Sequence, residues 1–369
     1  MVRPTHTLES PPSRQALVRD MTGAGSPPRP AAPEVILEAR PAIDFLVSLM
    51  LVTDAELLPA DREWFDASRA SLSDSLRRDL DRLFAAEHGP AAAVVALVVS
   101  DPSVRSSGDV VSLVGRISAR DLVAACCDRD DLKDAVAGAI RVLGGSRDER
   151  DRVVDLWPEE YRPMIGRILD DPDAELRALR RVLRAWRERF EQVETRVAHV
   201  EELDVAGRRA DLERLDLAGF VEQATGGVRW MPEAGTRRLY LSPSLFTRPY
   251  NYVFAGREWT MFAYPLADSA LDGESGGVPA ASVRLFKALG DESRLRILRL
   301  LASGDLYLTE IAERMGLSKP TVSHHLAQLR AAGLVTITQS GALTYYTLRR
   351  DRIAEAGVEL NRLVGGPAA

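Results

Sequence analysis

The first two thirds of the chain carry apolar residues at intervals of three and four, the spacing that places side chains on one face of an α-helix. A short apolar run at Val35–Glu38 precedes this pattern and predicts a strand. We therefore expect the region from Val35 to about Leu217 to be mostly helical. The pattern is clearest in four stretches: Ser73–Ala86, Ser118–Cys127, Leu132–Leu143 and Asp173–Leu203.

The last of these stretches has a stricter order, because its apolar residues alternate between steps of three and four as in a heptad repeat. Trp and Phe within the seam favour the core of a helical bundle over pairing with a second chain. We expect one long helix packed against its own domain, with an intermolecular coiled coil as the alternative. The seam consists of Leu176, Leu179, Leu183, Trp186, Phe190, Val193, Val197 and Val200.

Between Gly226 and Leu266 the pattern changes to short apolar and aromatic runs separated by Pro- and Gly-containing turns, which predicts a small antiparallel sheet. Its aromatic side chains could pack a core or line a small-molecule pocket, and core packing is the preferred interpretation. They are Tyr240, Phe246, Tyr250, Tyr252, Trp259, Phe262 and Tyr264.

Two segments without apolar periodicity divide the chain. Residues 1–33 are rich in Pro, Ser, Gly and Arg, as disordered tails are, and residues 268–279 are acidic and Gly-rich, as linkers are. The segments between and after them predict a helical domain with a small sheet at 34–267 and a second domain at 280–365.

The C-terminal segment predicts a helix-turn-helix followed by a β-hairpin. Asp291 is placed to cap its second helix and Ser318 its fourth. The expected fold class is therefore α+β: a mostly helical N-terminal domain with a small antiparallel sheet, then a C-terminal winged helix-turn-helix domain. The elements read from the sequence are helices from Val283, from Glu292, at Thr309–Met315 and at Lys319–Ala332, and strands at Leu334–Thr338 and Leu343–Leu348.

Composition and charge narrow the class of protein. The 369 residues are 46% hydrophobic and 28% charged, as in folded globular proteins. The apolar runs are too short to cross a bilayer and no export signal is visible, so we expect a cytoplasmic protein without a membrane partner. Residues 280–369 hold twelve Lys and Arg against eight Asp and Glu, a net charge of +4. Because the whole chain has a net charge of −6, residues 1–279 carry a net charge of −10. This asymmetry suits a C-terminal domain that meets a polyanion.

The helix predicted at Lys319–Ala332 carries the candidate chemistry. A helical projection turns Val322, Leu326 and Leu329 to the core, and leaves small or hydrogen-bonding side chains and no carboxylate on the opposite face. Such a helix suits a major groove about 12 Å wide, and its N-terminus can receive a phosphate. The candidate DNA-contacting residues are Ser318, Lys319, Pro320, Thr321, Ser323, His324 and Gln328.

Three segments, LFKALGDESRLRILRLL, LTEIAERMGLSKPTVSHHLAQLRAAGLV and TYYTL, resemble the winged-helix domain of ArsR-type bacterial transcriptional regulators. The resemblance implies a homodimer whose interface is formed by the first and last helices of this domain, and a fourth helix that reads double-stranded operator DNA. Residues 35–266 also resemble the N-terminal region of larger family members, for which the family offers no established activity.

The known metal sites of this family are not matched. Tyr307, Leu308 and Thr309 stand where metal-sensing members carry Cys-x-Cys, and the last helix has no His. Cys126 and Cys127 lie in an apolar helix without a third thiolate, which favours packing over ligation of a thiophilic ion. The wing turn at 339–342 is usually basic and here carries no charge. We expect no metal, no cofactor and no catalytic residue.

These observations predict a metal-independent regulator that binds a pseudo-palindromic operator as a homodimer, and a repressor rather than an activator because a bound dimer blocks polymerase without further parts. The N-terminal domain is expected to sense a small-molecule effector or to stiffen the dimer. The alternatives are an N-terminal enzyme fused to a winged helix and a winged helix that docks proteins. No Gly-rich phosphate loop, nucleophile elbow or metal-ligand cluster supports an enzyme.

Overall fold

The computed structural model describes residues 32–53, 59–84, 90–126, 138–139, 143, 145–157, 159, 161–230, 232, 235–247, 251–256, 258–267, 270–271, 278, 280–340 and 343–364. The tail predicted at 1–33, the linker predicted at 268–279, the helix predicted at Leu132–Leu143 and Cys127 lie wholly or largely outside these residues. Within the described ranges, no helix is both long enough and apolar enough to cross a bilayer.

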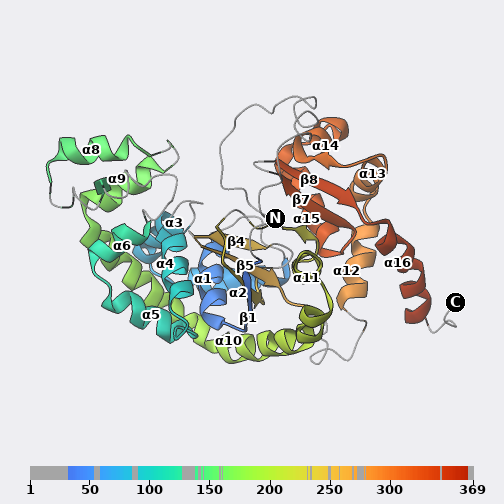
Figure 1. Cartoon of the computed structure of the whole chain (residues 1–369), viewed down its shortest axis with the longest axis horizontal. Helices are drawn as coiled ribbons and strands as arrows, with labels where there is room; N and C mark the ends of the chain where they lie inside the picture. The colour runs from blue at the N-terminus through green and yellow to red at the C-terminus, as the bar shows by residue number, and fades with distance from the viewer. Residues whose placement is uncertain are drawn as a thin grey trace.

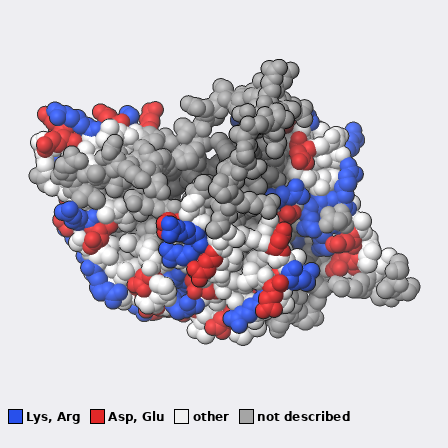
Figure 2. Space-filling view, viewed as in Figure 1, with Lys and Arg blue, Asp and Glu red and all other residues white. Residues whose placement is uncertain are grey.

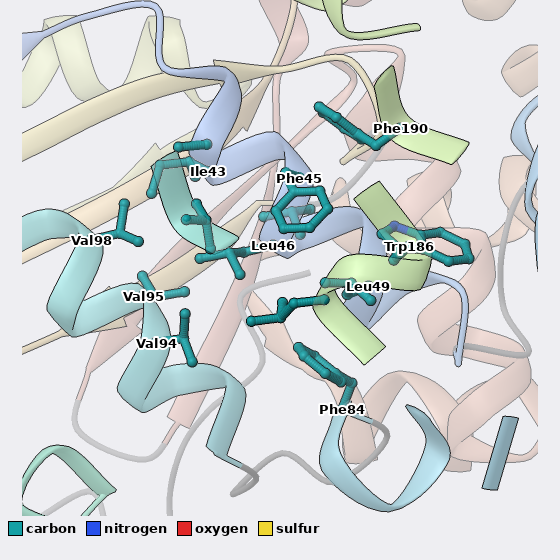
Figure 3. Close-up of a cluster of buried hydrophobic side chains, with 14 of the residues drawn as sticks. Ile43, Phe45, Leu46, Leu49, Phe84, Val94, Val95, Val98, Trp186 and Phe190 are labelled. Atoms are coloured by element: carbon teal, nitrogen blue, oxygen red, sulfur yellow. The ribbon is translucent and has the colours of Figure 1, made fainter. Parts of the chain in front are cut away.

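The N-terminal part is a group of helices packed around α1, Pro41–Leu51 (Figure 1). This helix is apolar on nearly every side and is buried because α4, α5 and α10 all contact it. In Figure 3, Leu46 of α1 lies between the valines of α4 and Trp186 of α10. The remaining elements of this part before α10 are β1 (Glu34–Leu37), α2 (Pro59–Ala70), α3 (Asp74–Phe84), α4 (Pro90–Ser100), α5 (Ser107–Arg116), α6 (Ala119–Cys126), α8 (Arg147–Val154) and α9 (Arg162–Asp170).

The long predicted helix is α10, Pro172–Arg214, which has 43 residues and follows the lower edge of the molecule in Figure 1. Asp171 caps it by accepting a hydrogen bond from the backbone N–H of Ala174 at 2.8 Å. Seven of the eight seam residues are buried, and Val193 is half-buried against the same apolar core. The interpretation of the seam as packing within one domain is confirmed for the described chain.

The first sheet is mixed, so the prediction of a purely antiparallel sheet was wrong. Its strand order is β1-β3-β5-β4, formed by β3 (Arg238–Ser244), β4 (Tyr252–Ala255) and β5 (Trp259–Pro265) with β1 at one edge. β1, β3 and β5 are parallel, and β4 pairs antiparallel with β5. The reason is burial: β5 is buried along its length and takes a central place, whereas the half-buried β4 lies at the edge.

The second reason is Pro243: the sequence pattern predicts a turn at this proline, and the residue instead lies inside β3. The carbonyl of Leu241 accepts a hydrogen bond from Glu38 on the β1 side, so Pro243, two residues further, faces that same side. The pairing with β1 ends at Leu241, and the nitrogen of Pro243 therefore has no ladder partner to lose.

The C-terminal part forms the predicted helix-turn-helix and hairpin. Asp291 caps α13 by accepting from the N–H of Arg294 at 2.9 Å, and Gly316 ends α14 with φ +67°, a left-handed conformation that favours glycine. The elements are α12 (Ala280–Leu289), α13 (Glu292–Leu301), β6 (Leu306–Tyr307), α14 (Leu308–Met315), α15 (Lys319–Ala331), β7 (Val335–Ser340), β8 (Leu343–Leu348) and α16 (Arg350–Leu363).

The N-terminal part contributes to this second region as well. After α11, Leu217–Ala224, a two-residue strand β2, Val228–Arg229, pairs parallel with β7, which gives the second sheet the order β2-β7-β8-β6. Alternate residues of the first sheet also divide between two cores: Tyr240 and Met261 join the helical core, whereas Leu241 and Phe262 join a core that contains the winged helix. The first sheet therefore lies between the two cores.

Candidate nucleic-acid interface

The candidate interface is the beginning of α15. Gly316 turns the chain, and Ser318 adopts an extended conformation and caps the helix, its Oγ accepting from the N–H of Thr321 at 3.3 Å. The hydroxyls of Ser318 and Thr321 also lie 2.8 Å apart. Pro320 occupies the first turn, where its missing N–H costs no intrahelical hydrogen bond.

The first turn of α15 is exposed and free of acidic residues. Ser318, Lys319, Pro320 and Thr321 are all exposed in the described chain. The positive end of the helix macrodipole and the Lys319 ammonium group are therefore both open to solvent, an arrangement that attracts an anionic group such as a phosphate.

Ser323 does not lie on this exposed surface. Its exposed fraction is 5%, so the prediction that Ser323 lies on the open face was wrong. Ala327, one turn further along the helix, is also buried, with an exposed fraction of 6%. The physical reason is that α12, α13, α14 and β7 all contact α15, which buries a wider arc of the helix than one apolar stripe predicts.

His324 and Gln328 are half-buried and belong to a polar network that reaches α13. The Nε2 atoms of His324 and Gln328 lie 2.6 Å apart, and Arg294 donates to Oε1 of Gln328. Arg294 also donates to the carbonyls of Lys287 and Ala288, at 2.6 and 2.8 Å. One guanidinium on α13 thus connects α15 to the C-terminal end of α12.

This network contains Arg294, which was not among the candidate residues predicted from the sequence. Arg294 lies three residues after the Asp291 cap, and no local spacing relates it to Gln328, which lies 34 residues further along the chain. The contact depends on how α13 crosses α15, and no local sequence signal predicts it.

The neighbouring His325 is held mainly in its neutral form. Burial lowers the pKa of His325 below its ordinary value, and Asp291, whose carboxylate lies 3.8 Å from Nδ1, opposes this effect. His325 therefore adds no charge to the surface of α15 at neutral pH, and the exposed cation at the start of the helix is Lys319.

Other cations surround the winged helix. On the face shown in Figure 2, Lys and Arg side chains gather over the winged-helix elements at the right of the view. Such a surface raises the local concentration of a polyanion and speeds its association. The exposed cations of α12 to α16 are Lys287, Arg296, Arg299, Arg314, Lys319 and Arg350.

At the positions where metal-sensing members of the family carry ligands, this chain has other side chains with other interactions. The Tyr307 N–H donates to the carboxylate of Glu310, and the Tyr307 ring packs edge-on against Tyr345. Cys126 is half-buried against the apolar cores. Across the part of the chain that the structure describes, no group of three or more His, Cys, Asp and Glu side chains is placed to hold a metal ion.

Comparison with known proteins places this geometry in a family. The profile described as "Bacterial regulatory protein, arsR family" matches residues 291–336. An uncharacterized HTH-type transcriptional regulator from Methanocaldococcus jannaschii is 39% identical over 75 residues, which are 20% of this chain and 84% of that protein. The chain belongs to the ArsR family.

Two further ArsR-type relatives bear on its activity. The transcriptional repressor SdpR of Bacillus subtilis is 42% identical over 64 residues, 17% of this chain and 71% of that protein. The transcriptional activator HlyU of Vibrio cholerae is 38% identical over 81 residues, 22% of this chain and 74% of that protein. A solved structure of reduced HlyU aligns with 23% of this chain and 88% of that one, at 38% identity and a TM-score of 0.20. The family profile and the sequence relatives support a DNA-binding regulator, and they leave most of the N-terminal part of this ArsR-family chain outside the alignment.

Proposed function

We propose that this chain is a homodimeric transcriptional repressor that binds a pseudo-palindromic operator in double-stranded DNA. The observation that carries the proposal is the exposed first turn of α15, which combines a capped helix N-terminus with Lys319 and has no carboxylate. In this arrangement Lys319 contacts a phosphate, and Thr321 and the accessible part of His324 contact base edges in the major groove.

The second copy of the chain is proposed to dock on α12 and α16. These helices contact each other, lie at the right-hand edge of the molecule in Figure 1, and are joined by a hydrogen bond from Ser282 to Glu359. Exposed apolar residues on a helix pair are typical of an interface. They are Val283 on α12 and Ile353, Val358 and Leu360 on α16. A two-fold dimer then matches the two halves of a pseudo-palindromic operator.

Metal independence is part of the proposal, because Tyr307 and Thr309 stand where thiolates would be needed. The N-terminal part is proposed to respond to a small-molecule effector or to hold the dimer rigid. A ligand there changes operator affinity only as far as it binds one arrangement of the two winged helices better than another.

The proposal is tested by fluorescence anisotropy, with a duplex from the chain's own upstream region and a random-sequence duplex. We expect Lys319→Ala to weaken binding to both duplexes. The slope of log affinity against log salt concentration should also become shallower, by about the amount that one phosphate contact contributes. His324→Ala and Thr321→Ala should each cost about 1–3 kcal/mol on the specific duplex and little on the random one. Addition of Zn²⁺, Ni²⁺ or arsenite should change neither affinity.

Arg299→Ala is the matched control, because it removes one exposed cation from α13 and not from the first turn of α15. Equal losses from Lys319→Ala and Arg299→Ala would mean that only overall charge matters. Binding of wild-type protein to both duplexes with the same affinity would refute a sequence-specific regulator.

A further inference from the structure

Strand β2 joins the N-terminal part to the winged helix through backbone pairing. Val228 lies opposite Ile337 and Arg229 opposite Thr338, and the N–H of Ile337 donates to the carbonyl of Gly227 at 2.7 Å. With β6 at the other side of the sheet, β2 covers the edge of β7 that would otherwise be open.

The turn before β2 is built for this contact. Thr225, which is 1% exposed, donates from Oγ1 to the carbonyl of Val221 at 2.6 Å and accepts from the N–H of Val228 at 3.0 Å. Gly227 has φ +108°, and a Cβ there would lie 3.0 Å from Cγ2 and 3.2 Å from Cα of Thr336. Only glycine allows β2 to approach β7 this closely without strain.

The strand that pairs with β2 is β7, which directly follows α15 in the chain. Gly333, with φ +70°, ends the helix, and the N–H of Leu334 donates back to the carbonyl of Leu329 at 2.9 Å. Leu334 and Ile337 are buried in the same core as Leu326 of α15. Because β7 is packed and hydrogen-bonded to the helix that precedes it, a constraint on β7 acts on α15.

We propose that β2 is a positioning segment for DNA recognition: its pairing with β7 fixes the orientation of α15 relative to the N-terminal part. The inference rests on the proposed function, since α15 must read DNA for its orientation to matter. It gives the N-terminal part a backbone contact with β7, the strand that follows the DNA-reading helix, so that a structural change in that part reaches α15 through β7.

Thermodynamic linkage gives this proposal a consequence that a purely structural role lacks. If β2 pairing strengthens operator binding, then operator binding must strengthen β2 pairing by the same factor. Saturating the full-length protein with operator should therefore slow hydrogen exchange at the amide of Arg229, which belongs to the N-terminal side of the contact.

The test compares two glycine variants of the full-length chain. Gly227→Val forces side-chain atoms into Thr336, whereas Gly226→Asn is the control, because Gly226 has φ +66°, which Asn tolerates, and no atom lies within 4 Å of a Cβ there. We expect Gly227→Val to lose exchange protection at Ile337 and to bind operator roughly tenfold more weakly, with unchanged binding to random DNA. Gly226→Asn should match wild type in all three measurements.

Thr225→Val is a second, milder variant that still tests the proposal if the Gly227→Val protein does not fold. It keeps the shape of the side chain, removes the hydrogen bond to Val228, and should shift exchange and operator affinity in the same direction by a smaller factor. Loss of protection at Ile337 with unchanged operator affinity would overturn the positioning role and leave the proposed function intact. A wild-type protein without preference for its own upstream DNA would instead refute the proposed function.

Discussion

The two largest apolar cores of the described chain, the helical core and the core shared with the winged helix, draw their residues from different parts of the sequence. The helical core draws all its buried residues from one continuous region, from Ala42 to Leu266. The second core draws on both sides of the predicted linker at 268–279, since the winged helix shares it with residues of α11, β2, β3 and β5. The N-terminal contribution to this shared core is Phe220, Val221, Ala224, Val228, Leu239, Leu241, Phe262 and Tyr264.

This difference shows that a break in the sequence pattern is not always a break in packing. A polar segment such as 268–279 marks where periodicity stops, but apolar side chains on either side of it can still bury each other. A smaller winged-helix protein must close its core by itself, whereas this one completes its core with a sheet face from the preceding region.

The largest expected effect comes from separating the two regions. A fragment of residues 280–369 leaves the shared core uncovered and the edge of β7 unpaired, so we expect it to aggregate or to unfold without a cooperative transition. Size-exclusion chromatography and thermal unfolding measure this. A full-length chain cleaved at a protease site inserted at 272–277 is the control, and both pieces should elute together. Cooperative unfolding of the fragment at the temperature of the full-length chain would contradict the shared core.

A smaller effect is expected from a cavity in the helical core. Trp186 is fully buried, packs edge-on against Trp64, and donates from Nε1 to Ser48 Oγ at 2.8 Å. Trp186→Ala should lower the free energy of unfolding by about 3–5 kcal/mol, measured by urea denaturation. Trp186→Phe should lose less. Hydrogen exchange at α15 should change little below the unfolding transition, and increased exchange there equal to that in α1 would mean that the two cores unfold as one.

The smallest effect is expected at Glu201, which lies where α10 passes from the helical core towards the shared core. Glu201 is fully buried, and burial, followed by the negative charges of Asp44 and Asp204, raises its pKa well above the ordinary value of 4.5. Asp204 in turn accepts hydrogen bonds from Tyr264 and from the N–H of Ala267. The folded state therefore keeps a proton that the unfolded state releases, and stability falls as pH rises above 4.5 until the folded pKa is passed.

Glu201→Gln removes the titrating carboxyl group, so the variant should have a larger free energy of unfolding than wild type. This difference should grow as pH rises from 5.5 towards 8.5, by no more than about 1.4 kcal/mol per pH unit. Urea denaturation at four pH values measures the difference. The nearby Arg105 favours the ionised form and limits the slope. A difference that does not change with pH would show that Glu201 is ionised throughout.

Much of the winged helix could be predicted from local chemistry. The Asp291 and Ser318 caps and the Gly316 turn are signals within a few residues of the elements that they define, and α13 and α15 lie within a few residues of their predicted bounds. The heptad seam likewise predicts the start of α10, but the helix continues eleven residues beyond the predicted end at Leu203, to Arg214. The strand at Val35–Glu38 was predicted for the same reason and is present as β1.

The missed features depend on contacts between distant segments. Strand β2 has two residues, too few for a hydrophobic pattern, and exists because β7 offers a free edge. Burial of Ser323 depends on how many elements surround α15, and the Arg294–Gln328 contact on how α13 crosses it. The parallel pairing of β3 with β5 follows from which strand is buried on both faces, which turn residues alone do not specify.

Helix α10 has one further consequence. Its N-terminal two thirds lie in the helical core, while Leu212 and Leu215 at its end pack against the shared core. A helix of 43 residues is roughly 65 Å long, so this one element extends from the N-terminal helices to the shared core without a break. The two cores are therefore joined by a continuous helix as well as by the first sheet.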